Sequence, residues 1–155
     1  SGLQVSYETI GIFKAYATRV GEGPFPSEIE KSDPIAKHLL EKGHEFGTTT
    51  GRERRCGWFD LVSAKHSIMT NGFNKIAIMK LDVLDGIKNI KVLKDDSSGQ
   101  DYDVLPGWDD STFGTKNYND LPDNAKNYLN YLEENLKIKI FLISTGPERD
   151  QTIVI

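Results

Sequence analysis

The stretch DLVSAKHSIMTNGFNKIAIMKL, residues 60–81, places a helical pattern directly before a strand pattern. Residues 60–71 repeat apolar side chains at helical spacing, and Gly72 is a typical helix stop. The predicted apolar face of this helix consists of Leu61, Ala64, Ile68 and Met69. Residues 75–81 then form an apolar run of strand length. This change from helical to strand patterning indicates an α/β protein.

The same alternation extends to both sides of this stretch. Three more apolar runs have the length of strands, at residues 10–16, 87–93 and 138–143, and the first is predicted to be buried. Two more segments have helical spacing with start or stop signals, at residues 32–43 and 121–136. Two polar, turn-rich segments are predicted loops, at residues 20–28 and 95–103. We therefore expect an α/β fold with a mixed sheet flanked by helices, in a single domain over residues 1–155.

Composition narrows the possible functions. Hydrophobic residues make up 37% and charged residues 27% of the chain, which is the balance of a soluble globular protein. A net charge of -4 argues against a protein that binds nucleic acid over its whole surface. No apolar run is long enough to span a bilayer and the N-terminus lacks a signal-peptide layout, so we expect a cytoplasmic protein without a membrane partner. The single Cys56 excludes an internal disulfide and fits a reducing cytosol.

The densest chemical signal is GTTTGRERRCG, residues 47–57. Its hydroxyl and guanidinium groups belong to Thr48, Thr49, Thr50, Arg52, Arg54 and Arg55. Arginine binds carboxylates and phosphates at two points, threonine hydroxyls complete such a shell, and Gly47 and Gly51 let the backbone approach a ligand. This composition favours an anion site over a solvated basic loop, without identifying the anion. Beside the arginines Cys56 has two interpretations, an activated thiol or, more often, a small packed side chain.

Two further candidates stand at the ends of predicted strands. Lys80-Leu81-Asp82 follows one strand, at the position where α/β sheets bind ligands. An aspartate there can accept hydrogen bonds from the N1–H and amino group of guanine, whereas the simpler interpretation is a surface ion pair or a helix cap. Ser144-Thr145-Gly146 follows another strand, and alone it predicts only a turn. The spacing of the three histidines and the nearby carboxylates predicts no metal site.

Five motifs, taken together and in order, resemble the adenylosuccinate synthetase family. They are FKAYATRVGEGPFPSE (residues 13–28), EFGTTTGRERRCGWFD (45–60), KLDVLDG (80–86), LPGWDDSTFG (105–114) and STGPERDQTI (144–153). The resemblance implies the C-terminal part of that family's P-loop NTPase-like fold and a role in purine biosynthesis. Members of the family use GTP and Mg²⁺ to phosphorylate the 6-oxygen of inosine monophosphate. They then displace this phosphate with the amino group of aspartate, which makes them GTP-dependent C–N ligases.

The resemblance also implies site residues, position by position. The loop that closes on aspartate matches Thr48, Thr49, Thr50, Gly51, Arg52, Glu53 and Arg54. Inosine monophosphate would be contacted by Arg52 and by the backbone of Val20. GTP would be contacted by Arg54, Lys80, Leu81, Asp82, Ser144, Thr145 and Gly146. The implied partners are these three small molecules and, in the full-length protein, a second copy in a homodimer.

Several parts of the family's site have no counterpart in this sequence. The resemblance assigns the glycine-rich phosphate loop, the aspartate that acts as general base and Mg²⁺ ligand, and the histidine that acts as general acid to an N-terminal half. We therefore expect a chain that begins at Ser1 within a longer enzyme, supplies no metal ligand and is inactive alone. The alternative is a stand-alone guanine-nucleotide-binding or regulatory module without catalysis. Two departures from the family's pattern, at Glu53 and in a shortened stretch before Leu105, remove no implied binding residue.

Overall fold

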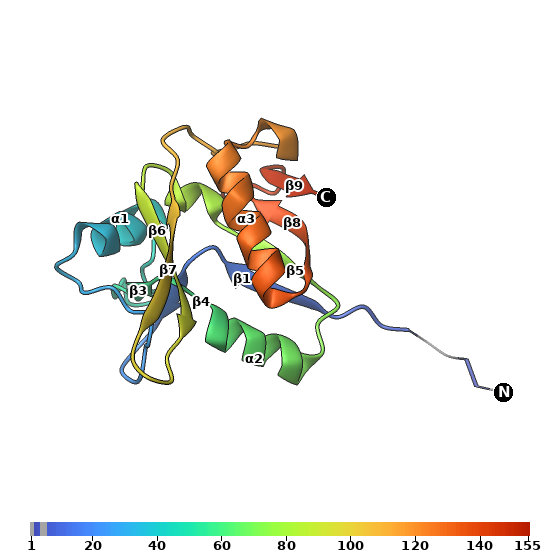
Figure 1. The fold of residues 1–155 in the computed structure, drawn as a ribbon. Coiled ribbons are helices and arrows are strands. Elements are labelled where there is room, and N and C mark those ends of the chain that lie inside the picture. Colours follow the sequence, from blue (N-terminus) through green and yellow to red (C-terminus); the bar gives the residue numbers. More distant parts are fainter. Residues whose placement is uncertain (1, 4–5) are drawn as a thin grey trace.

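The central sheet has four strands in the order β1–β5–β8–β9, in a computed structural model that describes residues 2–3 and 6–155 (Figure 1). These strands are β1 (Ile10–Lys14), β5 (Lys75–Met79), β8 (Lys139–Ser144) and β9 (Thr152–Val154). Strands β1 and β8 both run parallel to β5, and β9 runs antiparallel to β8. The sheet is therefore mixed, which confirms the sequence prediction.

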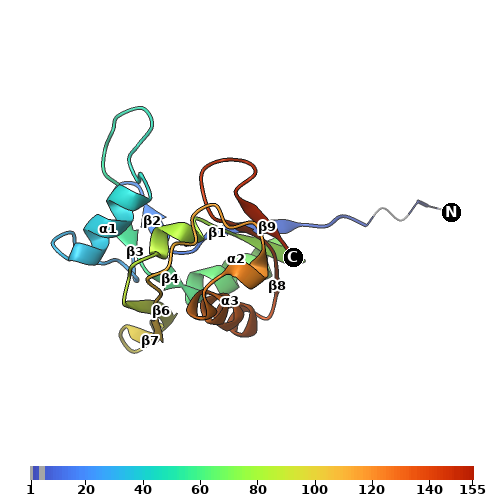
Figure 2. The ribbon, with the colours of Figure 1, turned by 90° about the horizontal axis from the view of Figure 1, so that it is seen from above.

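The α-helices are α1 (Pro34–Lys42), α2 (Leu61–Asn71) and α3 (Asp123–Leu136). Helices α2 and α3 contact each other and lie on the same side of the central sheet (Figure 2). The carboxylate of Asp33 caps α1 by accepting a hydrogen bond from the backbone N–H of Ile35 at 2.9 Å. Asp60 caps α2 through the N–H of Ser63 at 3.0 Å. Gly72 ends α2 with a φ of 64°, a conformation that favours glycine.

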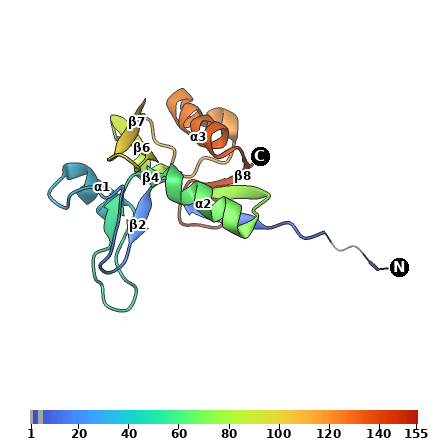
Figure 3. The same cartoon turned by 60° about the horizontal axis from the view of Figure 1, so that its bottom comes forward.

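Two smaller sheets lie beside the central one. Strands β4 (Phe59–Asp60), β6 (Asn89–Asp95) and β7 (Asp101–Pro106) form the first. Strands β2 (Ala17–Arg19) and β3 (Arg55–Gly57) form an antiparallel pair. Two single turns of 3-10 helix, η1 (Leu81–Leu84) and η2 (Tyr118–Asp120), complete the described elements. In Figure 3, α1 and β2 lie at one end of the molecule, while α3 and β8 lie towards the other.

The core connects α3 to the strands of the central sheet. The apolar stripe of α3 is buried, as the helical spacing predicts. It consists of Ala125, Tyr128, Leu129, Leu132 and Leu136. The hydroxyl group of Tyr128 donates a hydrogen bond to the backbone carbonyl of Ala15 at 2.6 Å. This bond satisfies a buried polar group and fixes the chain where it leaves β1.

Three sequence expectations need correction. Residues 101–103, predicted as loop, begin β7, which pairs with β6 although most of its side chains are only partly covered and give no apolar run. Met69, assigned to the apolar face of α2, is 77% exposed. Strand β1 was predicted to be buried, but it is not buried throughout. It lies at the edge of the sheet, and the side chain of Ile12 is 72% exposed. Strand ends also shift from their predicted positions by one or two residues.

Candidate functional site

Three neighbouring strands bring their carboxyl ends to one edge of the central sheet. Lys14, the last residue of β1, pairs with Met79 at the end of β5. Ile78 of β5 pairs with Ile143 near the end of β8. The segments that leave β5 and β8 at this edge are Lys80–Asp82 and Ser144–Gly146, so the fold places these two candidate segments side by side. Ligands of α/β sheets bind at such carboxyl edges, and this edge is therefore the candidate site.

A buried glutamate that the sequence analysis did not single out lies at this edge. The side chain of Glu45 has 0% exposed surface. Its carboxylate contacts Lys14 Nζ at 3.0 Å, Arg54 Nη1 at 2.8 Å and Lys80 Nζ at 2.9 Å. It also accepts a hydrogen bond from the hydroxyl group of Tyr16 at 2.6 Å. We call these five residues the Glu45 cluster; its pairing is what a fully buried carboxylate requires.

The turn after α1 directs Glu45 into this cluster. Gly43 ends α1, and a Cβ atom there would collide with the hydroxyl group of Tyr16 and lie 2.7 Å from the carbonyl oxygen of Leu39. Close approach, rather than a left-handed backbone, explains this glycine, because its φ is -85°. The ammonium group of Lys80 also donates to the carbonyl of Gly43 at 2.8 Å. A larger residue at this position would therefore separate Tyr16 from Glu45.

Residues 46–53, which we call the threonine loop, form a closed hairpin that projects beyond α1 (Figure 2). An antiparallel bridge joins Phe46 to Glu53, and the N–H of Gly47 donates to the carbonyl of Arg52 at 2.7 Å. Gly51 turns the chain with a φ of 64°. The exposed residues of the loop include Thr48, Thr49, Thr50, Gly51, Arg52 and Glu53. The three predicted hydroxyl donors and the guanidinium group of Arg52 thus face solvent at one projecting tip, whereas Arg54 and Arg55 lie outside the loop and are partly buried.

Arg55 ties the threonine loop region to the glycine- and proline-rich segment, residues 20–28. Its guanidinium group binds the carboxylate of Glu28 at two points, at 2.8 and 2.9 Å. It also donates to the backbone carbonyls of Gly21 at 3.0 Å and Gly23 at 2.9 Å. Val20, at the start of this segment, is 68% exposed. Arg55 is therefore fully engaged in shaping the backbone beside Val20.

The three arginines of the region consequently have different environments. Arg54 contacts Glu45, and Arg55 contacts Glu28. Among the residues that the structure describes, Arg52 has no ionic partner. It lines a hollow of about 260 Å³ between the threonine loop and the glycine-rich segment. Of these three arginines, Arg52 is therefore the most available to an anionic ligand.

Asp82 borders a second hollow, of about 480 Å³. Burial raises the pKa of its carboxyl group, and the charge of Asp85 acts in the same direction. Asp85 itself is engaged, since it accepts a hydrogen bond from Trp108 Nε1 at 2.6 Å. The other charged residues around the hollow are Lys42 and Asp109. A hollow with more carboxylates than cations suits a neutral group with N–H donors better than a phosphate.

The turn after β8 offers mainly backbone groups to this edge. The side chain of Ser144 donates to the carbonyl of Gly146 at 3.1 Å, and Thr145 donates to the carbonyl of Thr115 at 2.8 Å. Ser144 and Thr145 are buried, at 5% and 0% exposure. Leu81, at 0%, is likewise a core residue. The side chains of these three predicted GTP contacts therefore stabilise the fold, so any direct contact from them would come from the backbone.

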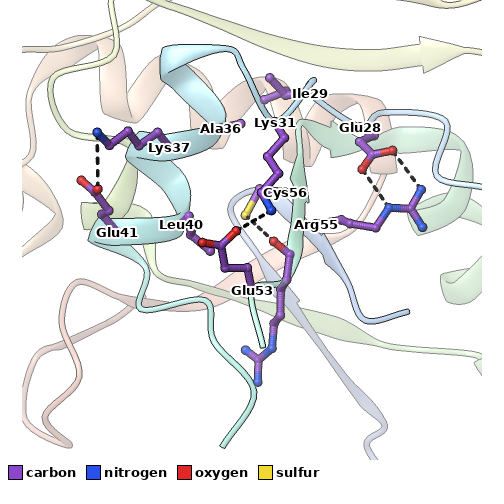
Figure 4. A pocket seen from close by; sticks show the side chains of 11 residues that line it. Glu28, Ile29, Lys31, Ala36, Lys37, Leu40, Glu41, Glu53, Arg55 and Cys56 are labelled. Carbon is purple, nitrogen blue, oxygen red and sulfur yellow. Dashed lines mark hydrogen bonds and ion pairs between the residues drawn. The ribbon is translucent and has the colours of Figure 1, made fainter. Parts of the chain in front are cut away.

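A separate cavity of about 320 Å³ lies between α1 and β3 (Figure 4). The ion pairs drawn around it are Lys31–Glu53, Lys37–Glu41 and Arg55–Glu28. The cation of each of these three pairs is already neutralised, whereas Arg52 has no ionic partner among the described residues, although Glu22 and Glu53 also line its hollow. Cys56, on its wall, is 4% exposed, and burial raises the pKa of its thiol to about 11. It is therefore a packed thiol and not an activated one.

Metal and membrane features are absent from the described part of the chain. No group of three or more His, Cys, Asp or Glu side chains among residues 2–3 and 6–155 is arranged to hold a metal ion. No helix within the same residues is long and apolar enough to cross a membrane.

The Glu45 cluster predicts a specific acid sensitivity. Burial alone would raise the pKa of Glu45, but hydrogen bonds from Tyr16, Lys80, Arg54 and Lys14 outweigh it and lower the pKa from 4.5 to about 2. A lowered folded-state pKa stabilises the protein above pH 4.5, and this contribution is lost as the pH falls through about 2. The shift corresponds to about 3 kcal/mol.

Urea unfolding of wild type and Glu45→Gln between pH 7 and pH 2 measures this contribution. The difference between their free energies of unfolding should shrink as the pH falls below 4.5. Other carboxyl groups titrate in both proteins, so their effects cancel in the difference. A difference that stays constant down to pH 2 would show that Glu45 is not held as a carboxylate by these partners.

The fold and the carboxyl edge together define an α/β protein with a candidate small-molecule site. The sequence pattern of the family described as adenylosuccinate synthetase matches residues 1–153, so the chain belongs to that family. An adenylosuccinate synthetase from Chromohalobacter salexigens is 49% identical over 94% of this chain, and one from Nitrosomonas europaea is 46% identical over 99%. The chain spans 38% and 40% of the lengths of these two curated relatives.

A solved structure supports the same assignment. The fully ligated adenylosuccinate synthetase from Plasmodium falciparum matches with a TM-score of 0.88 and 34% sequence identity. The match covers 94% of this chain and 39% of that protein. The predicted family and the predicted α/β fold are thereby confirmed.

Proposed function

We propose that the full-length protein is an adenylosuccinate synthetase, which converts inosine monophosphate, aspartate and GTP to adenylosuccinate, GDP and phosphate. This chain would supply the half of the site that binds aspartate and guanine. The observation that carries the proposal is that Glu45 and Arg54, the residues on either side of the threonine loop, meet Lys80 in the Glu45 cluster at one sheet edge. Family membership and this shared edge point to the same reaction.

The threonine loop has the chemistry to bind an amino acid with two carboxylates. Arg52 offers a planar pair of donors, and Thr48, Thr49 and Thr50 add hydroxyl donors at the same exposed tip. The hollow beside Arg52 is also bordered by Gly21 and Gly23, close to Val20 in the sequence. We infer that aspartate and inosine monophosphate meet here, with Arg52 able to contact both.

The hollow beside Asp82 has the chemistry to bind guanine. A carboxylate accepts two hydrogen bonds, and guanine offers N1–H and its amino group on one edge. Gly146, which follows the neighbouring strand β8, would complete the pocket through its backbone, and Lys80 would lie across the base. Arg54, which follows the threonine loop, would contact aspartate and, from its position on Glu45, would also reach the phosphates of GTP.

The remaining groups of the reaction would come from the rest of the enzyme. The described carboxylates, histidines and Cys56 form no group of three or more that could hold a metal ion, and we assign Mg²⁺ no step here. We place the general base, the general acid and the phosphate loop outside residues 1–155. We further infer that these residues form one domain, within a cytoplasmic enzyme that acts as a homodimer.

The proposal is tested by comparing the full-length protein with this chain alone. Each is incubated with inosine monophosphate, GTP, aspartate and Mg²⁺, and adenylosuccinate is quantified. We expect turnover on the order of 1 per second from the full-length protein and none from the chain, because we place the acid, base and metal ligands of the reaction outside it. Comparable turnover by the chain would show that the catalytic groups lie within residues 1–155, contrary to the proposal.

The same preparations distinguish the alternative function. A stand-alone guanine-nucleotide-binding module would bind GTP equally well with or without the rest of the enzyme, and the full-length protein would make no product. Calorimetric titration of both proteins with GTP measures this difference. We expect tighter binding by the full-length protein, because half a site supplies only part of the contacts.

A further inference from the structure

Glu45 joins three parts of the molecule that are distant in sequence. Lys14 comes from the end of β1, Arg54 from the residue before β3, and Lys80 from the residue after β5. Among the five residues of the cluster, Glu45 is the only carboxylate, and it faces three cations. The resemblance gives Glu45 no contact with a substrate, and its complete burial leaves it no surface with which to make one.

Each oxygen of the Glu45 carboxylate binds one of the two cations that we propose to contact ligands. Lys80 Nζ lies 2.9 Å from Oε1, and Arg54 Nη1 lies 2.8 Å from Oε2. Lys14 Nζ bridges both oxygens, at 3.1 and 3.0 Å. The separation of Arg54 from Lys80 is therefore set by the width of a single carboxylate group. Such charge-assisted hydrogen bonds fix position as well as charge.

Both cations keep part of their surface open while they are held. The side chain of Arg54 is 26% exposed and that of Lys80 is 36% exposed. The hydroxyl group of Tyr16 adds a fourth donor, on Oε1, which further restricts rotation of the carboxylate. Three cations on one carboxylate leave the cluster with a formal charge of +2, so the open surfaces retain attraction for an anion.

We propose that Glu45 is a positioning residue that holds Arg54 of the aspartate site and Lys80 of the guanine site in one fixed arrangement. The proposal rests on the proposed function, because it takes Arg54 and Lys80 as ligand contacts. It deepens that function by making one buried carboxylate responsible for the alignment of two substrates. Removing its charge leaves three unneutralised cations, which repel one another and move apart.

Glu45→Gln in the full-length enzyme tests the proposal. The amide keeps the size of the side chain and still accepts a hydrogen bond from Tyr16, but it has no negative charge. We expect the Michaelis constants for GTP and for aspartate both to rise at least about tenfold, since two charge-assisted contacts lose their alignment. The Michaelis constant for inosine monophosphate should change less than about twofold, because Arg52 does not touch Glu45.

A matched control separates alignment from general loss of stability. Asp103 also accepts hydrogen bonds from a lysine and a tyrosine, Lys94 at 3.0 Å and Tyr131 at 2.6 Å, but between β6, β7 and α3. Asp103→Asn should lower the melting temperature without raising any Michaelis constant. A Glu45→Gln variant that behaves like this control would reduce Glu45 to a structural residue and overturn the proposal.

A double-mutant cycle tests whether Glu45 acts through Lys80. Lys80→Met alone should raise the Michaelis constant for GTP, and adding Glu45→Gln should raise it by a smaller factor than in wild type, because Lys80 is already absent and only Arg54 remains for Glu45 to align. Additive effects would contradict the proposal. If Glu45→Gln does not fold, Tyr16→Phe removes one donor from the carboxylate and should raise both Michaelis constants by a smaller factor. If Tyr16→Phe changes neither constant, the proposal is wrong.

Failure of the proposed function would look different from failure of this inference. A wild-type full-length protein that makes no adenylosuccinate would remove the proposed function and with it the roles of Arg54 and Lys80. A wild type that makes the product with GTP and aspartate, beside a Glu45→Gln variant with unchanged Michaelis constants, would remove only the positioning role.

Discussion

Replacing Arg52 by leucine in the full-length enzyme is expected to raise the Michaelis constant for aspartate about tenfold to a hundredfold. The guanidinium group has no ionic partner among the described residues, so its loss removes a ligand contact and breaks no internal ion pair. Losing a charge-assisted hydrogen bond typically costs about 1.5–3 kcal/mol, which gives this range. Steady-state kinetics at varied aspartate concentration measure the effect.

Two variants control this experiment. Arg52→Lys should restore little of the lost affinity, because an ammonium group cannot place two parallel donors on one carboxylate. Lys65→Leu, which removes an exposed cation from α2, should leave the Michaelis constant unchanged. An unchanged Michaelis constant in Arg52→Leu would show that Arg52 does not bind aspartate. The threonine loop would then be a solvated basic loop, the alternative interpretation of its sequence.

Arg52 can be tested this cleanly only because the three arginines have different partners. Sequence alone gave Arg52 and Arg54 the same chemistry. In the fold, Arg54 is part of a buried ion cluster, so Arg54→Leu would change stability and ligand binding together. Arg52 is therefore the arginine whose replacement breaks no internal ion pair among the described residues.

Helices were predictable because their signals are local. Asp33 and Asp60 cap α1 and α2, and Gly72 ends α2, so a few neighbouring residues decide each boundary. Strand β7 was not predictable, since it forms by pairing with β6 and not by its own pattern. The exposure of Met69 likewise depends on what packs against α2 in the fold, and periodicity along one helix does not specify this.

The candidate site was predictable in its exposed parts and not in its buried centre. The threonine loop concentrates donors within a few residues, so composition reveals it. The Glu45 cluster forms from β1, the start of β3 and the end of β5, which only folding brings together. A glutamate beside a basic loop gives a weak sequence signal, because most such residues are solvated. From the sequence, Arg54 was an anion ligand or a solvated cation, and Lys80 was a ligand contact or part of a surface ion pair or helix cap. In the structure both neutralise a buried internal carboxylate.

Changing Asp82 to asparagine in the full-length enzyme should shift its nucleotide preference from GTP towards xanthosine triphosphate. Guanine presents two donors to a carboxylate that only accepts, whereas asparagine presents one donor and one acceptor. Binding of GTP should weaken by roughly 1–3 kcal/mol, the cost of a buried group left without a partner. Xanthosine triphosphate has a 2-oxo group in place of the amino group, so it accepts the new hydrogen bond and gains relative to GTP.

The measurement is the ratio of kcat/KM for GTP to kcat/KM for xanthosine triphosphate, in wild type and in variants. Asp109→Asn is the matched control, because Asp109 borders the same hollow and the substitution removes the same charge. An effect of charge alone would move the ratio equally in both variants, since both nucleotides carry the same triphosphate. Recognition of the base by Asp82 should move the ratio only in Asp82→Asn. If Asp82→Asn leaves the ratio where it is in wild type, Asp82 does not contact the base, and the guanine half of the proposed site is wrong.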